Sequence, residues 1–210
     1  MKISDYQKDC FRNYKSSIGY PEHYHYLHGT PINALVPIET VQNKVMVVGA
    51  YPSAKFFTVA TENGSSVIDT PVADNDAPFS NESYFDGSRV RTIPSGKELN
   101  EVILHKIGVD RSECWITDLV KVFLFKEGHV KRYEKLDKTD IEANRSRFYE
   151  YAQKSLPWLR QEIEICNPLI ILLGTEVTSV IFEVPEPTAK SYLDGHVRQK
   201  QVNQVTRNFV

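Results

Sequence analysis

The sequence predicts an α/β fold built on a mainly parallel sheet, because short apolar runs alternate with helical patterns along the chain. Residues 169–173 form an unbroken apolar run, residues 45–48 form a second, and a third runs from Trp115 towards Phe125. Runs of this kind are typical of strands that are buried on both faces of a parallel sheet. The chain has 210 residues, 41% of them hydrophobic, so we expect one sizeable core and a single domain over residues 1–210.

Helical patterns lie between and before these runs. The spacing of apolar residues predicts a short amphipathic helix over residues 4–16. A second helix is expected to begin at Ser95, with Glu98 completing a capping box, and to end at Gly108.

The second half of the chain continues the alternation. Residues 126–138 are charged, and we expect them to be exposed. A long helix is predicted over about residues 140–166, and Pro157 is expected to kink it or to split it in two. After the last apolar run, Gly174 turns the chain into a final helix that Thr175 caps.

Composition limits the partners of the chain. It carries 25 Lys and Arg against 27 Asp and Glu, a formal net charge of -2, whereas a non-specific DNA coat protein is usually more basic. No apolar run approaches the roughly 18 residues of a membrane span. The first residues also lack the apolar stretch of a signal peptide. We expect a cytoplasmic protein with no membrane partner, and a monomer.

Neither the cysteines nor the histidines form a metal-binding pattern. The three cysteines are far apart and form no C-x-x-C pair, so we expect buried, inert thiols rather than a disulfide framework or a zinc site. The cluster at His23, His25 and His28 contains no H-E-x-x-H, and packing of this Tyr- and His-rich segment is favoured over metal binding. We therefore expect no metal and no cofactor.

The candidate site lies where strands end. In an open parallel sheet, ligands bind beyond the carboxyl ends of the strands. Three loops begin at such ends: residues 49–53, Asp118 with its neighbours, and Gly174 with Thr175. The 40 or so residues after Ser53 are rich in Gly, Pro, Ser, Asp and Asn, and a stretch of this length is usually a functional loop.

Five segments carry a family resemblance. In chain order they are G-A-Y-P-S at 49–53, P-F at 78–79, S-G-K-E-L at 95–99, I-T-D-L-V-K at 116–121, and the strand from Asn167-Pro168 to Gly174. They resemble, in order and spacing, the motifs of the uracil-DNA glycosylase superfamily from about residue 44 to residue 183. The resemblance implies a three-layer α/β/α fold with a central, mainly parallel four-stranded sheet. It also implies a DNA partner and excision of a damaged base.

The resemblance assigns roles to single residues. Phe79 matches the ring that stacks on a flipped base; the alternative is an ordinary core or loop-anchoring Phe. Asp118 stands where the family has an Asn that both donates to and accepts from uracil. An ionised Asp only accepts, so it suits a base that presents an amino group; the alternative is a structural or helix-capping carboxylate. Further base and DNA contacts fall on Gly49, Ala50, Pro52, Ser53, Lys55, Gly174 and Thr175.

Two departures from the family pattern affect catalysis. The family places Asp, Asn or Glu within the two residues before the motif proline, whereas Ala50 and Tyr51 stand here. We keep Tyr51 and Asp118 as candidate catalytic residues, together with Asp76 or Asp74 of the acid-rich loop, which are otherwise turn formers. The family's H-P-x motif is expected after the strand that ends at Val210, so it lies beyond the given sequence or is lacking. Its iron–sulfur branch needs four thiolates, and we expect no cluster.

Three hypotheses follow. The leading one is a DNA-repair glycosylase, and the second is a catalytically inactive nucleic-acid- or nucleobase-binding member of the same fold. A third, another nucleotide-handling hydrolase, lacks a P-loop, G-x-G-x-x-G or G-x-S-x-G motif. Residues 121–147 carry eight Lys and Arg against five acids, a surplus that suits a phosphate-facing side or a solvated mixed face.

Overall fold

The structure is a computed structural model that describes residues 1–26, 30–52, 55–61, 64–70, 77–80, 83–85, 89–92, 94–135 and 140–210. For residues 55–61, 64–70, 84–85 and 91 it describes the backbone.

The central sheet has five strands among the described residues. In order across the sheet they are β6 (Cys114–Asp118), β1 (Val45–Gly49), β7 (Leu169–Leu172), β9 (Val205–Phe209) and β8 (Arg198–Val202). The first four are parallel, and β8 pairs antiparallel with β9. The predicted α/β class with a mainly parallel sheet is confirmed.

The sheet has one strand more than the four expected. The extra strand, β8, forms a hairpin with β9 through Asn203 and Gln204, which both have positive φ, the conformation of a tight hairpin turn. Its sequence, R-Q-K-Q-V, contains no apolar run because β8 is an edge strand whose side chains are largely in water. The apolar-run criterion therefore missed it.

Alternate residues of the strands enter two separate cores. Met46, Val48 and Trp115 join a large cluster, whereas Val47, Cys114 and Ile116 join a small one with Leu99 and Leu104. This alternation is what a strand buried on both faces requires.

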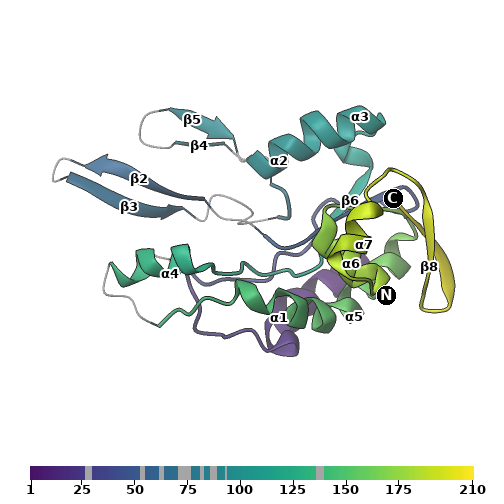
Figure 1. Ribbon diagram of the computed structural model, residues 1–210, viewed down its shortest axis with the longest axis horizontal. Helices are drawn as coiled ribbons and strands as arrows, with labels where there is room; N and C mark the ends of the chain where they lie inside the picture. Colours follow the sequence, from purple (N-terminus) through teal and green to yellow (C-terminus); the bar gives the residue numbers. More distant parts are fainter. Residues whose placement is uncertain are drawn as a thin grey trace.

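Helices cover both faces of the sheet. The large cluster is covered by α1 (Ile3–Ile18), α5 (Phe148–Cys166) and α6 (Thr175–Phe182). The small cluster is covered by a π-helix (Leu99–Leu104), which continues α2 (Pro94–Glu98) and leads into α3 (His105–Ile107). Figure 1 shows α2 and α3 on one side of the sheet and α1 and α5 on the other. The short helix α7 (Glu186–Ser191) follows α6. No described helix is long and apolar enough to cross a membrane.

Two helices begin at other residues than expected, and the long helix is not split at Pro157. The second helix ends at Gly108 in the left-handed conformation, as predicted, but it begins at Pro94, and the Ser95 hydroxyl has no hydrogen-bond partner among the described residues. The long helix α5 begins at Phe148, directly after the 3-10 turn Arg145–Arg147; Asn144, which precedes this turn, accepts a hydrogen bond from the Phe125 N–H through its side chain. It runs through Pro157 without a break.

The strand expected to run from Trp115 towards Phe125 ends at Asp118. Leu119 and Val120 still donate to carbonyls of the chain that leaves β1, but the Lys121 N–H donates to the Tyr14 hydroxyl instead of a strand. Residues 119–125 remain buried, so their apolar character reflects burial rather than a continued strand.

The region expected to be one long loop contains two hairpins. They are formed by β2 (Lys55–Thr61) with β3 (Gly64–Thr70) and by β4 (Ser83–Phe85) with β5 (Val90–Thr92). The charged segment after Phe125 forms α4 (Glu127–Glu134). Figure 1 shows both hairpins and α4 projecting from the same end of the molecule, away from β8.

The three cysteines are free and buried, as expected for inert thiols. Burial raises the pKa of Cys114 to about 11, and that of Cys10 and Cys166 to about 12. The Tyr- and His-rich segment packs into the large cluster, where Tyr24 and Tyr26 contact Phe125 and Phe123.

Candidate functional site

Gly49 and Asp118 end the two central strands side by side. They are paired residues in the parallel register of β1 and β6. Asp118 follows Ile116 by two residues, so its side chain lies on the face of the small cluster. Its carboxylate is buried, with 1% of the residue exposed. Because Gly49 has no side chain, the space beside this carboxylate is open to another group.

The ring of Phe79 occupies that space. A Cβ atom on Gly49 would lie 2.2 Å from Asp118 Oδ1 and 2.5 Å from Phe79 Cε2, closer than real Cβ atoms come. The ring and the carboxylate therefore meet over the Cα of Gly49, and only glycine fits there. Phe79 is half-buried against the small cluster. The structure thus brings together Gly49, Phe79 and Asp118, three residues that sequence reasoning had singled out.

A buried ion pair lies behind Asp118. Lys121 and Glu162 have fully buried side chains and form a 2.6 Å salt bridge. The Lys121 ammonium also donates to the Asp118 carbonyl oxygen at 3.0 Å and to Thr117 Oγ1 at 2.6 Å. The main chain at Asp118 is therefore held by a charge inside the core.

Two aromatic donors complete the surroundings of Glu162. The Tyr6 hydroxyl donates to one carboxylate oxygen, and the Trp115 indole N–H donates to the other at 3.2 Å. Burial, together with the charge of Glu162, raises the pKa of Tyr6 far above its ordinary value, so Tyr6 stays a donor. Sequence reasoning had counted Lys121 among the charges of a surface segment, which is wrong: it is fully buried.

Tyr51 belongs to a different group of side chains. Its ring packs against the large cluster beside Phe148, and its hydroxyl accepts a 2.7 Å hydrogen bond from Arg145 Nε. The Arg145 guanidinium lies 4.7 Å from the Tyr51 ring centroid and forms an ion pair with Glu176. The sequence indicated Arg145 only as one of the charges of residues 121–147 and gave no sign of these contacts, because its partners are distant in the chain.

The loop at Gly174 and Thr175 is connected to Tyr51 through the neighbouring residue Glu176. Gly174 has a φ of 95°, is exposed and precedes α6, whose first residue, Thr175, is half-buried. Glu176 follows in the first turn, so its ion pair with Arg145 links the end of β7 to Tyr51 at the end of β1. Ala50 is half-buried against the large cluster, and Pro52 is buried.

Several predicted residues lie outside the described part of the chain: Ser53, Asp74, Asp76 and His28. Lys55 is described only as backbone of β2. Among the described residues, no group of three or more His, Cys, Asp or Glu side chains converges as a metal site would require.

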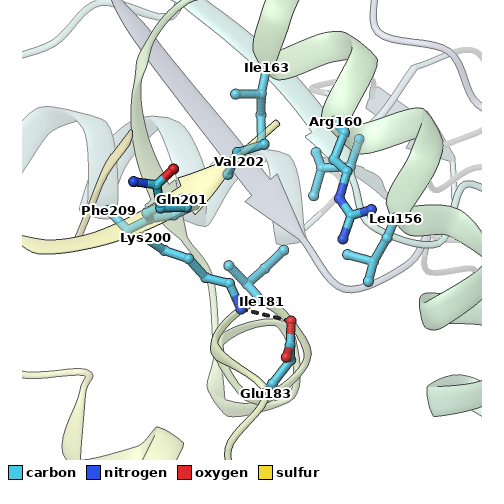
Figure 2. Close-up of a pocket in the computed structure, with 10 residues that line it drawn as sticks. Leu156, Arg160, Ile163, Ile181, Glu183, Lys200, Gln201, Val202 and Phe209 are labelled. Atoms are coloured by element: carbon cyan, nitrogen blue, oxygen red, sulfur yellow. Dashed lines mark hydrogen bonds and ion pairs between the residues drawn. The ribbon is translucent and has the colours of Figure 1, made fainter. Parts of the chain in front are cut away.

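A separate pocket is too small for a base. Figure 2 shows it between α5, the end of α6 and the β8–β9 hairpin, with Ile181, Val202 and Phe209 in its wall. Lys200 and Glu183 form a 2.9 Å ion pair at its edge. Its volume of about 30 Å³ is room for about one water molecule. Gly49, Phe79 and Asp118 are not among the residues that line it.

The comparisons with known proteins now decide the family. A family model for the uracil DNA glycosylase superfamily matches residues 38–207, from before β1 into β9. The chain belongs to the uracil-DNA glycosylase superfamily. No curated protein sequence matches it. The superfamily match includes Gly49, Phe79 and Asp118 within its range.

Proposed function

We propose that this superfamily member binds a base extruded from DNA at the meeting point of Phe79 and Asp118 and hydrolyses its N-glycosidic bond. The observation that carries the proposal is the convergence of an aromatic ring and a carboxylate over a residue with no side chain. Extruding a base costs a few kcal/mol. Stacking on an aromatic ring returns about 1–3 kcal/mol per base. Phe79 supplies such a ring, and Asp118 supplies a hydrogen-bonding edge.

The acceptor character of Asp118 sets the class of base. An ionised carboxylate accepts hydrogen bonds and repels the O4 oxygen of uracil, so it favours a base with an exocyclic amino group. Replacing Asp118 by Asn restores a group that both donates and accepts. We expect Asp118→Asn to move the binding preference from cytosine towards uracil by about tenfold, since one good base-edge contact is worth about 1–3 kcal/mol of discrimination.

Basic side chains near α4 suit contact with the DNA backbone. Lys126, Lys131 and Lys135 are exposed there, and α4 projects from the same end of the molecule as the two hairpins (Figure 1). Backbone contacts of this kind orient DNA without reading its sequence. Their loss is expected to weaken binding equally for all bases and to reduce its salt dependence.

The proposal is tested with single-stranded oligonucleotides that each carry one central uracil, hypoxanthine, cytosine or adenine. Binding is measured by fluorescence anisotropy, and base release by alkaline cleavage of the abasic product. We expect tighter binding and release for at least one base, with both lost in Asp118→Ala. Binding that is the same for all four bases and unchanged in Phe79→Ala and Asp118→Ala would exclude a base site here.

A second candidate function is binding without hydrolysis. The position before Pro52 carries Tyr51, which has neither a carboxylate nor an amide and whose hydroxyl is bonded to Arg145. This arrangement leaves no acid at that position to place a water molecule. Base-selective binding with no release of any base in the same assay would support this second function.

A further inference from the structure

The backbone of Phe79 has an unusual conformation. Its φ is 52°, in the left-handed region that residues other than Gly, Asn and Asp seldom adopt. Such a residue keeps this conformation only where its surroundings hold it. The direction of the Phe79 ring therefore depends on what holds residues 78–80.

Arg111 holds one side of this segment. Its guanidinium donates to the Phe79 carbonyl oxygen at 2.9 Å and reaches the Pro78 carbonyl oxygen at 3.4 Å. Arg111 Nε forms a 2.7 Å ion pair with Glu39, and its side chain is 19% exposed. A planar fork of donors anchored by a carboxylate is well suited to fix two adjacent carbonyl groups.

Helix α2 holds the other side of the segment that contains Phe79. A Cβ atom on Gly96 would lie 2.0 Å from the Ser80 carbonyl oxygen, so α2 and the segment touch backbone to backbone. Asn100, in the π-helix that follows, accepts a 3.2 Å hydrogen bond from Arg111. Single π-helical turns often occur at functional sites. The segment thus lies between Gly96 and Arg111, with Asn100 joining the two supports.

Arg111 also stands at the start of the element that carries Asp118. The 3-10 turn Arg111–Glu113 leads directly into β6, whose last residue is Asp118. One continuous segment, the turn followed by β6, therefore carries the guanidinium that holds Phe79 at its start and the Asp118 carboxylate at its end.

We propose that Arg111 is a positioning residue that keeps the Phe79 ring facing Asp118 for stacking on an extruded base; this inference rests on the proposed function. Arg111 makes no contact with the base. It acts through the Phe79 main chain, and Glu39 orients it. Its removal lets the ring leave the meeting point and weakens base binding.

The first experiment is a double-mutant cycle. The probe is a fluorescein-labelled single-stranded oligonucleotide with one central 2-aminopurine, whose amino group suits an acceptor and whose fluorescence falls on stacking. We expect Phe79→Ala and Arg111→Met each to weaken binding about tenfold and to change the 2-aminopurine fluorescence of the bound oligonucleotide in the same direction. In the Phe79→Ala background, Arg111→Met is expected to change binding less than twofold, because the ring it acts through is absent.

The matched control is Arg198→Met. Arg198 likewise donates to two backbone carbonyl groups, those of Tyr192 and His196, and pairs with Asp194, but it lies at the β8 hairpin. We expect it to leave binding within twofold. Arg111→Lys keeps a positive charge near Glu39 without the fork of donors, so it tests the geometry if the Met variant unfolds. An intermediate loss supports the proposal, and an equal loss of binding from Arg111→Met in both backgrounds contradicts it.

A second readout needs no DNA. The native cysteines are buried, so Phe79→Cys accepts a nitroxide spin label at a single, half-buried site. Arg111→Met is expected to increase the mobility of this label, and Arg198→Met is not. Unchanged mobility would overturn the positioning role of Arg111. Increased mobility together with DNA binding that is unchanged in Phe79→Ala would instead overturn the base-stacking function, while Arg111 would still be the residue that holds the Phe79 main chain.

Discussion

Gly49 and Tyr51 are two residues apart at the end of β1, yet the space beside each is filled in a different way. Beside Gly49, the ring of Phe79 and the carboxylate of Asp118 arrive from other parts of the chain. Beside Tyr51, the residue's own ring fills the space and binds Arg145. The space over Gly49 is thus filled by side chains from distant residues, whereas the space at Tyr51 is filled by the residue's own ring. The proposed base recognition belongs with the Gly49 side, and the departure from the family pattern before Pro52 belongs with the Tyr51 side.

The largest effect is expected from breaking the buried ion pair between Lys121 and Glu162, since Lys121 also holds the main chain at Asp118. Lys121→Met leaves Glu162 charged and buried without its cation, which typically costs about 3–5 kcal/mol. Denaturant unfolding measures the change. Lys154→Met, which breaks an exposed pair with Glu150, is the control and should cost less than about 1 kcal/mol. Similar losses in the two variants would show that the buried pair does not support β6.

The next largest effect is expected from filling the space over Gly49. Gly49→Ala places a methyl group against both Asp118 and Phe79, so one of them must move. We expect loss of base-selective binding and a destabilisation of about 1–3 kcal/mol, as for an overpacked core. Gly128→Ala is the control, because a Cβ there meets nothing within 4 Å. In α4 it should stabilise by about 0.5–1 kcal/mol. Normal binding by Gly49→Ala would mean that the ring and carboxylate need not meet.

A pH effect is expected on the side of the large cluster. Burial, followed by the nearby Lys126 and Arg132, lowers the pKa of His129 to about 4 from 6.5. The unfolded chain therefore binds the extra proton first as pH falls. The stabilising effect of neutral His129 is complete above pH 6.5 and is lost between 6.5 and about 4. We expect a decrease of about 1–2 kcal/mol over this window. Unfolding curves of His129→Phe should be flatter there; an equally steep profile would assign the effect to other groups.

The smallest effect is expected from Tyr51→Phe. The variant removes one hydroxyl that accepts from Arg145 and keeps the ring contacts. A single hydrogen bond of this kind contributes about 1 kcal/mol. DNA binding should stay within twofold of the wild type, since Tyr51 is not among the groups over Gly49. Base release sharpens the comparison: its loss in this variant would give the Tyr51 hydroxyl a part in hydrolysis, and its persistence would exclude one.

The contacts on the Gly49 and Tyr51 sides also differ in how far sequence reasoning reached them. Gly49, Phe79 and Asp118 were found because each stands in a short motif or at the end of an apolar run. Arg111 and Arg145 stand in no motif, and their partners are distant: Arg111 and Phe79 are 32 residues apart, and Arg145 and Tyr51 are 94 apart. The charge pattern wrongly indicated an exposed Lys121, because its partner Glu162 lies 41 residues later in the chain, on another element.

The sequence by itself determined the alternation of strands and helices, the buried runs of β1 and β7, the helix stop at Gly108 and the position of the candidate residues at the strand ends. Each of these follows from residues close together in the chain, through burial on both faces or the backbone freedom of glycine. Tertiary structure alone decided that Lys121 is buried, that Tyr51 turns towards Arg145 and that Arg111 holds Phe79. These contacts join distant segments, and their energies exist only once the chain has brought those segments together.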